Sequence, residues 1–457
     1  MAGIGFELRK ILERNNYTST LQAYFYAGII SSGPWVLSIV SMLLVGIISI
    51  KRFSDTQELS YFLVTVTYLM AGSLVMTGGT QLLLTRFIAD RMYEKRNDLI
   101  LPNTMGALAL TAVIAALAAG PAVCLLFPDK NLYFRLLTFT AFVILNCLWL
   151  AVIFLSGLKA YNRILLTMAI GYTTVVILSA LLSNYQAEGL MLAFVVGHAL
   201  ILFAFMNEIF RAFPGDKLLS FDFLKRCNIH PSLFFIGLAF YLGIWSDKFI
   251  FWFNPITSEA TAGYLRSSVI YDIPIFLAYL TIIPGMAVFL VRFETDFAEN
   301  YSRFYDAIRE HQPLKTIQYN KQLMVDSVRQ GILEILKIQS LTVILLFVWT
   351  RELLSWLGIS YYYETLLQVD MVGVGIQVIM LAVMNVLFYL DRRKEALQLS
   401  LVFLGSNTLF TLASQKTNPA FFGYGFVIAV TLTTIIGLLM ISRILRDLEY
   451  ETFMLRN

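Results

Sequence analysis

The sequence has little charge for its length. Asp, Glu, Lys and Arg make up 14% of the 457 residues, whereas 58% are hydrophobic. Soluble domains carry about 25% charged residues, so this chain has too few polar side chains to cover a globule in water. Several apolar runs approach the roughly 20 residues that cross a bilayer. The composition excludes a large soluble part and predicts an all-α integral membrane protein surrounded by membrane lipid.

Cysteine and histidine are also scarce, with three of each in the chain. Cys124 and Cys147 fall in apolar segments and Cys227 in a basic loop, and their spacing matches no metal site. The sequence contains no phosphate-binding GxxxxGK[ST] loop, so ATP does not power this chain directly. HExxH and GxSxG motifs are absent too. We expect no catalytic residue, no metal, no cofactor and no nucleic-acid partner.

The apolar runs predict about twelve transmembrane helices when hydropathy is read in windows of about 19 residues. The expected spans are 21–50, 61–84, 104–126, 136–158, 164–182, 189–210, 232–253, 271–291, 332–349, 367–390, 396–412 and 421–441.

Lysine and arginine set the orientation of these spans. With the N-terminus inside, 25 of the 34 Lys and Arg residues lie in cytoplasmic segments and seven on the opposite side. Cytoplasmic loops are enriched in these residues, so the bias predicts cytoplasmic N- and C-termini. We expect a multi-pass membrane protein.

The spans divide into two groups of six. A polar segment, 211–231, separates an N-terminal lobe at 1–210 from a C-terminal lobe at 232–457. The second and eighth spans both end in L-x-R-F-x-x-D, from Leu84 to Asp90 and from Leu290 to Asp296, 206 residues apart. The match favours parallel repeats about an axis along the membrane normal, although chance remains an alternative.

One cytoplasmic loop, 292–331, has the apolar stripe of an amphipathic helix. Its stripe is Phe293, Phe297, Tyr301, Phe304 and Ile308. Acidic and basic residues balance in this loop, which is not typical of a segment that binds lipid through positive charge. The helix lies against the bundle or the interface, or it docks a cytoplasmic partner through Phe297, Tyr301 and Phe304.

The seventh span contains two adjacent charges, Asp247 and Lys248. Each costs about 2.5–3.5 kcal/mol at mid-bilayer, so each needs a partner or water. Neighbouring helical residues point about 100° apart, so we expect separate partners, with Asp272 and Asp370 as candidates for Lys248. The charges belong to a structural network between helices, or they line a hydrated substrate path between the lobes.

Three prolines within spans predict helix breaks. Pro34 interrupts the first span, and Pro274 and Pro284 interrupt the eighth. Breaks in the opening spans of both halves suggest elements that bend during transport, with static kinks as the alternative. Trp35 and Trp245 are candidates for stacking on sugar rings along the path.

Two further polar features lie within spans. Glu334 and Lys337, three residues apart near the inner end of the ninth span, are expected to pair with each other. His198 in the sixth span is either a packing histidine or a proton relay.

Five strings of residues resemble one known family. They are Met1–Lys10 (MAGIGFELRK), Gly28–Trp35 (GIISSGPW), Trp245–Phe249 (WSDKF), Tyr271–Pro274 (YDIP) and Arg292–Asp296 (RFETD). Together they resemble the PelG family of inner-membrane exopolysaccharide transporters, in the flippase and multidrug-exporter (MATE-like) superfamily.

The resemblance implies twelve helices in two six-helix lobes around a central cavity. It also implies export of an N-acetylgalactosamine-rich polymer to the periplasm. The implied partners are a PelF-like cytoplasmic glycosyltransferase and PelD- and PelE-like membrane proteins.

Two other classes of protein remain open. A MATE-type drug or ion antiporter would need a titratable carboxylate in a closed ion site, and the first half offers only Glu208, near a span end. A polytopic glycosyltransferase would need carboxylates gathered on a sizeable loop. The outer loops are short and contain no DxD motif.

Overall fold

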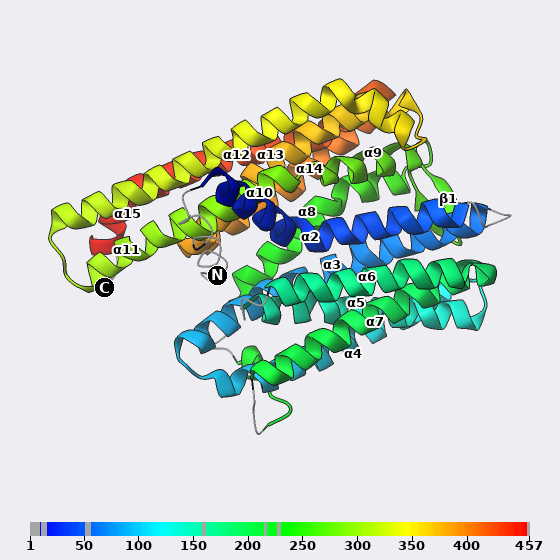
Figure 1. Ribbon diagram of the computed structural model, residues 1–457, viewed down its shortest axis with the longest axis horizontal. Helices are drawn as coiled ribbons and strands as arrows, with labels where there is room; N and C mark the ends of the chain where they lie inside the picture. The colour runs from blue at the N-terminus through cyan, green and yellow to red at the C-terminus, as the bar shows by residue number, and fades with distance from the viewer. Residues whose placement is uncertain are drawn as a thin grey trace. The chain divides into compact units, whose positions relative to one another are not determined.

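The structure, a computed structural model, describes residues 10, 16–50, 56–157, 161–213, 217–225 and 230–454. Ten helices within these residues are long and apolar enough to cross a membrane, and two bent helix pairs bring the number to twelve. The prediction of an all-α membrane protein with about twelve spans is confirmed. The helices are α2 (Tyr17–Ile50), α3 (Thr56–Tyr93), α4 (Ile100–Leu126), α5 (Leu132–Gly157), α6 (Tyr161–Leu181), α7 (Gln186–Ala212), α8 (Pro231–Phe253), α9 (Val269–Leu280), α10 (Ile283–Val291), α11 (Ala298–Arg309), α12 (Leu314–Trp356), α13 (Glu364–Tyr389), α14 (Arg393–Gln415) and α15 (Tyr424–Met454) (Figure 1).

Several helices are longer than the apolar runs that identified them. The ninth span was predicted to begin at 332, whereas α12 begins at Leu314 and has 43 residues. At 1.5 Å per residue it is about 64 Å long, roughly twice the thickness of the hydrocarbon core. Hydropathy detects only the part of a helix that lies in lipid, so it missed the polar extension.

The chain forms two compact units, each described by itself below. The 34–269 unit is Pro34–Val269, and the 270–457 unit combines Ile270–Asn457 with Met1–Gly33. These boundaries differ from those of the predicted lobes at 1–210 and 232–457. Helix α8 belongs to the 34–269 unit, and the first half of α2 belongs to the 270–457 unit. The six-plus-six repeat therefore remains a prediction.

The 34–269 unit contains a β-hairpin that the sequence did not predict. Strands β1 (Glu259–Ala262) and β2 (Leu265–Ser267) pair antiparallel after α8. The amide of Tyr264 donates to the Leu126 carbonyl at 3.1 Å, and the Tyr68 hydroxyl donates to the Arg266 carbonyl at 2.8 Å. These bonds attach the hairpin to α3 and to the C-terminal end of α4.

Residues 217–225 of the predicted linker pack on the start of α4. The amide of Ser220 donates to the Pro102 carbonyl at 3.0 Å, and the amide of Phe223 donates to the Asn103 side chain at 3.2 Å. Asp222 accepts from Lys225 and Ser220, and these interactions hold the pKa of its carboxyl well below the usual range. The linker is thus fixed to the 34–269 unit by several hydrogen bonds.

In the 270–457 unit, the polar ends of α12 and α15 lie together with α11 (Figure 1). Lys321 on α12 pairs with Glu449 on α15 at 3.2 Å and donates to the Arg446 carbonyl at 3.1 Å. We call residues 298–331 of α11 and α12 and residues 442–454 of α15 the stalk. It is the part of this unit that extends beyond the predicted spans.

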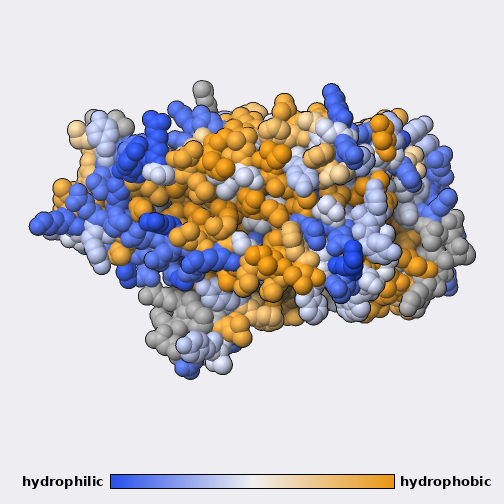
Figure 2. All heavy atoms as spheres, turned by 90° about the horizontal axis from the view of Figure 1, so that it is seen from above, coloured by the Kyte–Doolittle hydropathy of each residue, from blue (hydrophilic) through white to orange (hydrophobic). Residues whose placement is uncertain are grey.

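The molecular surface agrees with a membrane location. On the face drawn in Figure 2, hydrophobic side chains gather in a broad central band and hydrophilic ones toward the ends. Exposed aliphatic residues such as Leu341, Ile344 and Leu439 lie on α12 and α15. Side chains of this kind are stable in contact with lipid, so the chain is a multi-pass integral membrane protein.

The contact between α3 and α8 depends on glycine. A Cβ on Gly237 would lie 2.1 Å from the Gly78 carbonyl oxygen, so the two backbones touch. We expect Gly237→Ala to destabilise the protein by about 1–3 kcal/mol, because overpacking forces the helices apart. The measurement is the thermal unfolding midpoint in detergent. Gly120→Ala is the control, since nothing lies within 4 Å of its added Cβ. Equal midpoints for the two variants would contradict the prediction.

Candidate functional site

Asp247 and Lys248 form a buried ion pair within α8. The Lys248 Nζ lies 3.0 Å from Asp247 Oδ2, and the side chains are 1% and 0% exposed, respectively. The same ammonium donates to the Ile244 carbonyl at 3.0 Å. The prediction that these neighbours would not pair is wrong. Although their Cβ atoms point in different directions, the four-carbon stem of lysine is long enough to bend back to the carboxylate.

Aromatic rings pack near the pair within the 34–269 unit. Trp252 stacks on Tyr68 with ring centroids 4.5 Å apart, and Trp245 lies 6.1 Å from Trp252. The Lys248 Nζ is 5.9 Å from the Trp245 ring. Trp245 and Trp252 are both buried. These tryptophans therefore pack against the chain itself and present no open ring to a sugar in this conformation.

Asp272 and Asp370 lie in the 270–457 unit. Asp272 is in the first turn of α9 and is partly buried, whereas Asp370 is fully buried in α13. Gly423, with a φ of +86°, packs so closely that a Cβ there would lie 2.9 Å from an Asp370 carboxylate oxygen. Pairing of either aspartate with Lys248 remains a prediction.

The proline-containing spans are interrupted at two places. In the first span, the segments Tyr17–Gly33 and Val36–Ile50 flank Pro34, and the side chains of Pro34 and Trp35 lie outside the described residues. In the eighth span the break separates Leu280 from Ile283, and Pro284 lies in the first turn of α10. The predicted break at Pro274 is wrong, because α9 continues through it. Pro274 is the sixth of the twelve residues of α9, and the helix continues through it although proline supplies no backbone donor there.

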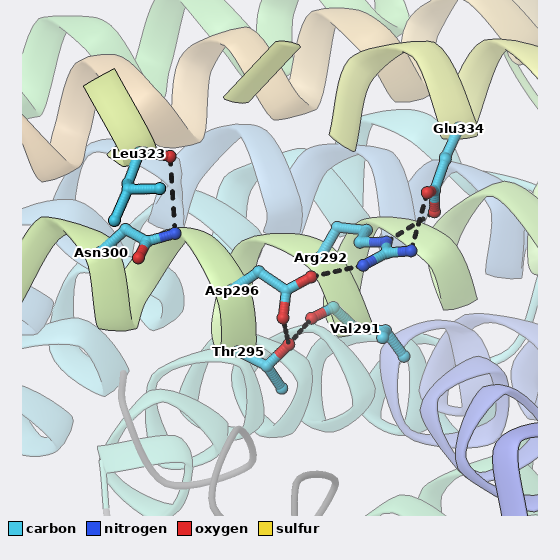
Figure 3. Close-up of polar contacts among 7 residues, drawn as sticks. All are labelled: Val291, Arg292, Thr295, Asp296, Asn300, Leu323 and Glu334. Atoms are coloured by element: carbon cyan, nitrogen blue, oxygen red, sulfur yellow. Dashed lines mark hydrogen bonds and ion pairs between the residues drawn. The ribbon is translucent and has the colours of Figure 1, made fainter. Parts of the chain in front are cut away.

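A charged cluster joins the C-terminal end of α10 to α12 (Figure 3). Arg292 begins a short π-helix, Arg292–Phe297. Its Nε and Nη2 donate to the two Glu334 oxygens at 2.5 and 2.7 Å, and its Nη1 donates to Asp296 at 2.5 Å. The Tyr24 hydroxyl on α2 also bonds to Arg292. The predicted Glu334–Lys337 pair is therefore wrong, since a bidentate arginine is the better partner for a carboxylate.

The repeated L-x-R-F-x-x-D motif makes the same ion pair in both copies. Arg86 lies 3.0 Å from Asp90, and Arg292 lies 2.5 Å from Asp296. Both pairs are four residues apart on a helix, the spacing at which opposite charges meet. The common geometry supports a structural role for the motif.

The aromatic stripe of loop 292–331 faces the protein's own helices. Phe297 and Phe304 are fully buried, and Tyr301 is partly buried. Phe297 and Tyr301 both pack against Tyr389 of α13, at ring-centroid distances of 5.2 and 5.4 Å. Direct docking of a partner on Phe297 and Phe304 is excluded in this conformation, because an amphipathic helix buries its apolar stripe wherever the chain offers a surface.

His198 is enclosed by aromatic rings in the 34–269 unit. Its Nδ1 bonds to the Phe194 carbonyl at 2.9 Å, and its ring lies 3.9 Å from Phe194 and 5.4 Å from Tyr172. This environment is typical of a packing histidine. Among the described residues, no group of three or more His, Cys, Asp and Glu side chains could hold a metal ion.

Comparison with solved structures gives the class of fold. A MOP superfamily transporter from Pyrococcus furiosus matches with a TM-score of 0.67 and 13% identity, over 93% of this chain and 96% of that one. A multidrug resistance MATE family transporter in its outward-facing conformation matches equally well, with a TM-score of 0.67, 13% identity and the same coverage. A MATE structure in the bent conformation has a TM-score of 0.66 and 15% identity, again over 93% and 96% of the two chains. The fold is that of the MATE transporters of the MOP superfamily.

The sequence comparison gives the family. The model of the PelG family, described as an exopolysaccharide exporter (EPS-E), matches residues 1–453. This chain belongs to the PelG family, as the five strings of residues predicted. No curated protein matches the sequence. The family makes the chain a membrane transporter and not an enzyme.

The buried ion pair leads to a prediction about stability. We expect Asp247→Asn to lower the thermal midpoint and the membrane abundance, because it leaves the Lys248 ammonium buried without its carboxylate. Breaking a buried pair in this way costs about 3–5 kcal/mol. Replacing both residues, as Asp247→Asn with Lys248→Met, should cost less than the single change.

The control is an exposed pair, Arg351 and Glu364, 3.3 Å apart. Arg351→Met should change stability by less than about 1 kcal/mol. A wild-type midpoint for Asp247→Asn would show that the pair does not stabilise the fold.

Proposed function

We propose that this protein exports an exopolysaccharide, N-acetylgalactosamine-rich like Pel, from the cytoplasm to the periplasm of a bacterium. The observation that carries the proposal is the family match over residues 1–453. The twelve-span MATE fold supports it, since this fold moves substrates across a membrane without a soluble catalytic domain. The inner membrane is the location that an exporter of a cytoplasmic product requires.

The candidate path residues are charged or aromatic side chains within or beside spans. They are Asp247, Lys248, Asp272, Asp370, Trp35 and Trp245. Carboxylates and ammonium groups hydrogen-bond to sugar hydroxyls and amides without holding a polymer tightly. Asp247 and Lys248 are closed to solvent in this conformation, so they would reach substrate only after a rearrangement around α8. The proposed path runs between the two six-helix halves of the sequence.

The proposed partners follow from the substrate. A growing polymer has to pass from its synthase to the exporter, so we propose contact with a PelF-like cytoplasmic glycosyltransferase and with PelD- and PelE-like membrane proteins. Because Phe297 and Phe304 are buried, the partner surface would be the exposed side of the stalk, which includes Tyr319.

A second candidate function is drug or ion antiport. It is favoured by the solved structure of a multidrug resistance MATE transporter, which shares this fold. The two functions differ in the substrate that leaves the cell.

The first functional prediction separates them. Deleting the gene should abolish secretion of N-acetylgalactosamine-rich polymer, detected with a lectin, while susceptibility to cationic drugs stays unchanged. Secretion should return with the wild-type chain expressed in trans. An unchanged polymer with increased drug susceptibility would instead establish the antiporter.

The second functional prediction concerns topology, with both termini inside. A cysteine placed at Ile256, which is 89% exposed, should react with an impermeant thiol reagent in cells with a permeabilised outer membrane. A cysteine at Tyr319, which is 64% exposed, should not react until the inner membrane is opened. The background carries serine at Cys124, Cys147 and Cys227.

Labelling of opened membranes is the control, because it shows that both cysteines are reactive. Reaction at position 319 in cells with an intact inner membrane would reverse the orientation.

A further inference from the structure

The eighth span is interrupted at residues 281 and 282. Helix α9 ends at Leu280, α10 begins at Ile283, and the segments on either side of the break meet at an angle of 40°. The amides of Thr281 and Ile282 turn back to the carbonyls three residues earlier, at 3.0 and 3.4 Å. In a regular α-helix, the Thr281 carbonyl would accept from the Gly285 amide. That bond is the one that the bend opens.

The side chain of Gln339 on α12 occupies the opened position. Its Nε2 donates to the Thr281 carbonyl at 3.0 Å, and its Oε1 accepts from the Gly285 amide at 3.2 Å. One side-chain amide thus bonds to both groups of a single broken helical bond. Gln339 is 3% exposed, so water does not compete for these groups.

Two glycines make room for this side chain. A Cβ on Gly285 would lie 2.5 Å from the Gln339 Oε1, and a Cβ on Gly375 of α13 would lie 2.9 Å from its Cγ. The Gln339 side chain therefore fits at the break because α10 and α13, the two helices that face it, have glycine at these positions.

We infer that the break is a two-state hinge and that Gln339 holds its bent state. In hydrocarbon, an unpaired backbone amide or carbonyl costs several kcal/mol, so both groups need a partner in every stable state. In the bent state both bond to Gln339. In the straight state the Gly285 amide bonds directly to the Thr281 carbonyl, and the Gln339 amide withdraws. Each state satisfies the backbone, which allows an exchange between them.

The hinge moves α9 relative to the pair of α10 and α12. Gln339 binds the start of α10, and Glu334, five residues earlier on α12, binds Arg292 directly after its end. Because α12 holds α10 at both ends, those two helices move as one body. The arm that swings is α9, which carries Asp272. Its use in export rests on the proposed function.

The test measures the hinge directly with two spin labels. Ile270→Cys on α9 and Ser302→Cys on α11 lie on opposite sides of the break, both within the 270–457 unit, in the cysteine-free background. At 1.5 Å per residue, closing a 40° bend lengthens this separation by about 3 Å. We expect Gln339→Leu and Gly285→Ala to shift the pulsed dipolar distance distribution toward the longer value. Gly405→Ala, whose Cβ meets nothing within 4 Å, should leave it unchanged. Distributions identical to wild type in both hinge variants would overturn the proposal.

A double-mutant cycle distinguishes a specific loss of the Gln339 contacts from general misfolding of a variant. Among the described residues outside its own helix backbone, the nearest atoms to a Cβ at Gly285 belong to Gln339, at 2.5 and 3.3 Å, and a Val378 methyl follows at 3.4 Å. Gly285→Ala should therefore lower the thermal midpoint in the wild type and have little effect in a Gln339→Ala background. Additive losses in the cycle would show that Gln339 does not occupy the break, and would overturn the proposal. Both measurements use purified protein without substrate, so their outcome is independent of whether the protein exports a polysaccharide.

Discussion

The hydrocarbon core offers no water, so every backbone and charged group within it has to find a partner in the chain. Regular helices meet this requirement for most of the twelve spans, and the exceptions explain the polar side chains that remain. Lys248 satisfies its ammonium with the carboxylate of Asp247 and the carbonyl of Ile244. Gln339 satisfies the two backbone groups that the broken eighth span releases. At these two places, a polar side chain within a span is explained by the partners that it finds in the chain.

The sequence predicted the spans well because hydropathy is a local property of about 20 residues. The sequence-based prediction of side-chain contacts failed where the partner lies far along the chain, or where the length of a side chain decides whether two residues can pair. Glu334 bonds to Arg292, which is 42 residues away, and no periodicity reveals that pairing. Asp247 and Lys248 pair because lysine is flexible, which an argument from Cβ directions ignores. Pro284 follows a real break and Pro274 does not mark one, so the presence of a proline does not by itself locate a helix break. No pattern in the sequence indicated that Gln339 bonds to the broken eighth span.

Fold and substrate rest on different parts of the molecule. The MATE structures share only 13–15% of their residues with this chain, yet they match over 93% of it. Helix packing tolerates such divergence as long as apolar faces and small residues allow close contact, and Gly78 and Gly237 allow it here between α3 and α8. Recognition of a substrate needs only a few side chains on that frame. The family match is therefore the stronger argument for a polysaccharide, and the fold is the stronger argument for transport.

The length of α12 has a mechanical consequence. A continuous helix of 43 residues acts as a lever whose fulcrum is in the bilayer. Residues 314–331 of α12 precede the predicted span and make up about 27 Å of its length, so a tilt of about 10° displaces the Leu314 end by about 5 Å. The ion pair between Lys321 and Glu449 would transmit this displacement to α15. A small rotation among lipids would thus become a movement large enough for a protein bound outside the bilayer to detect.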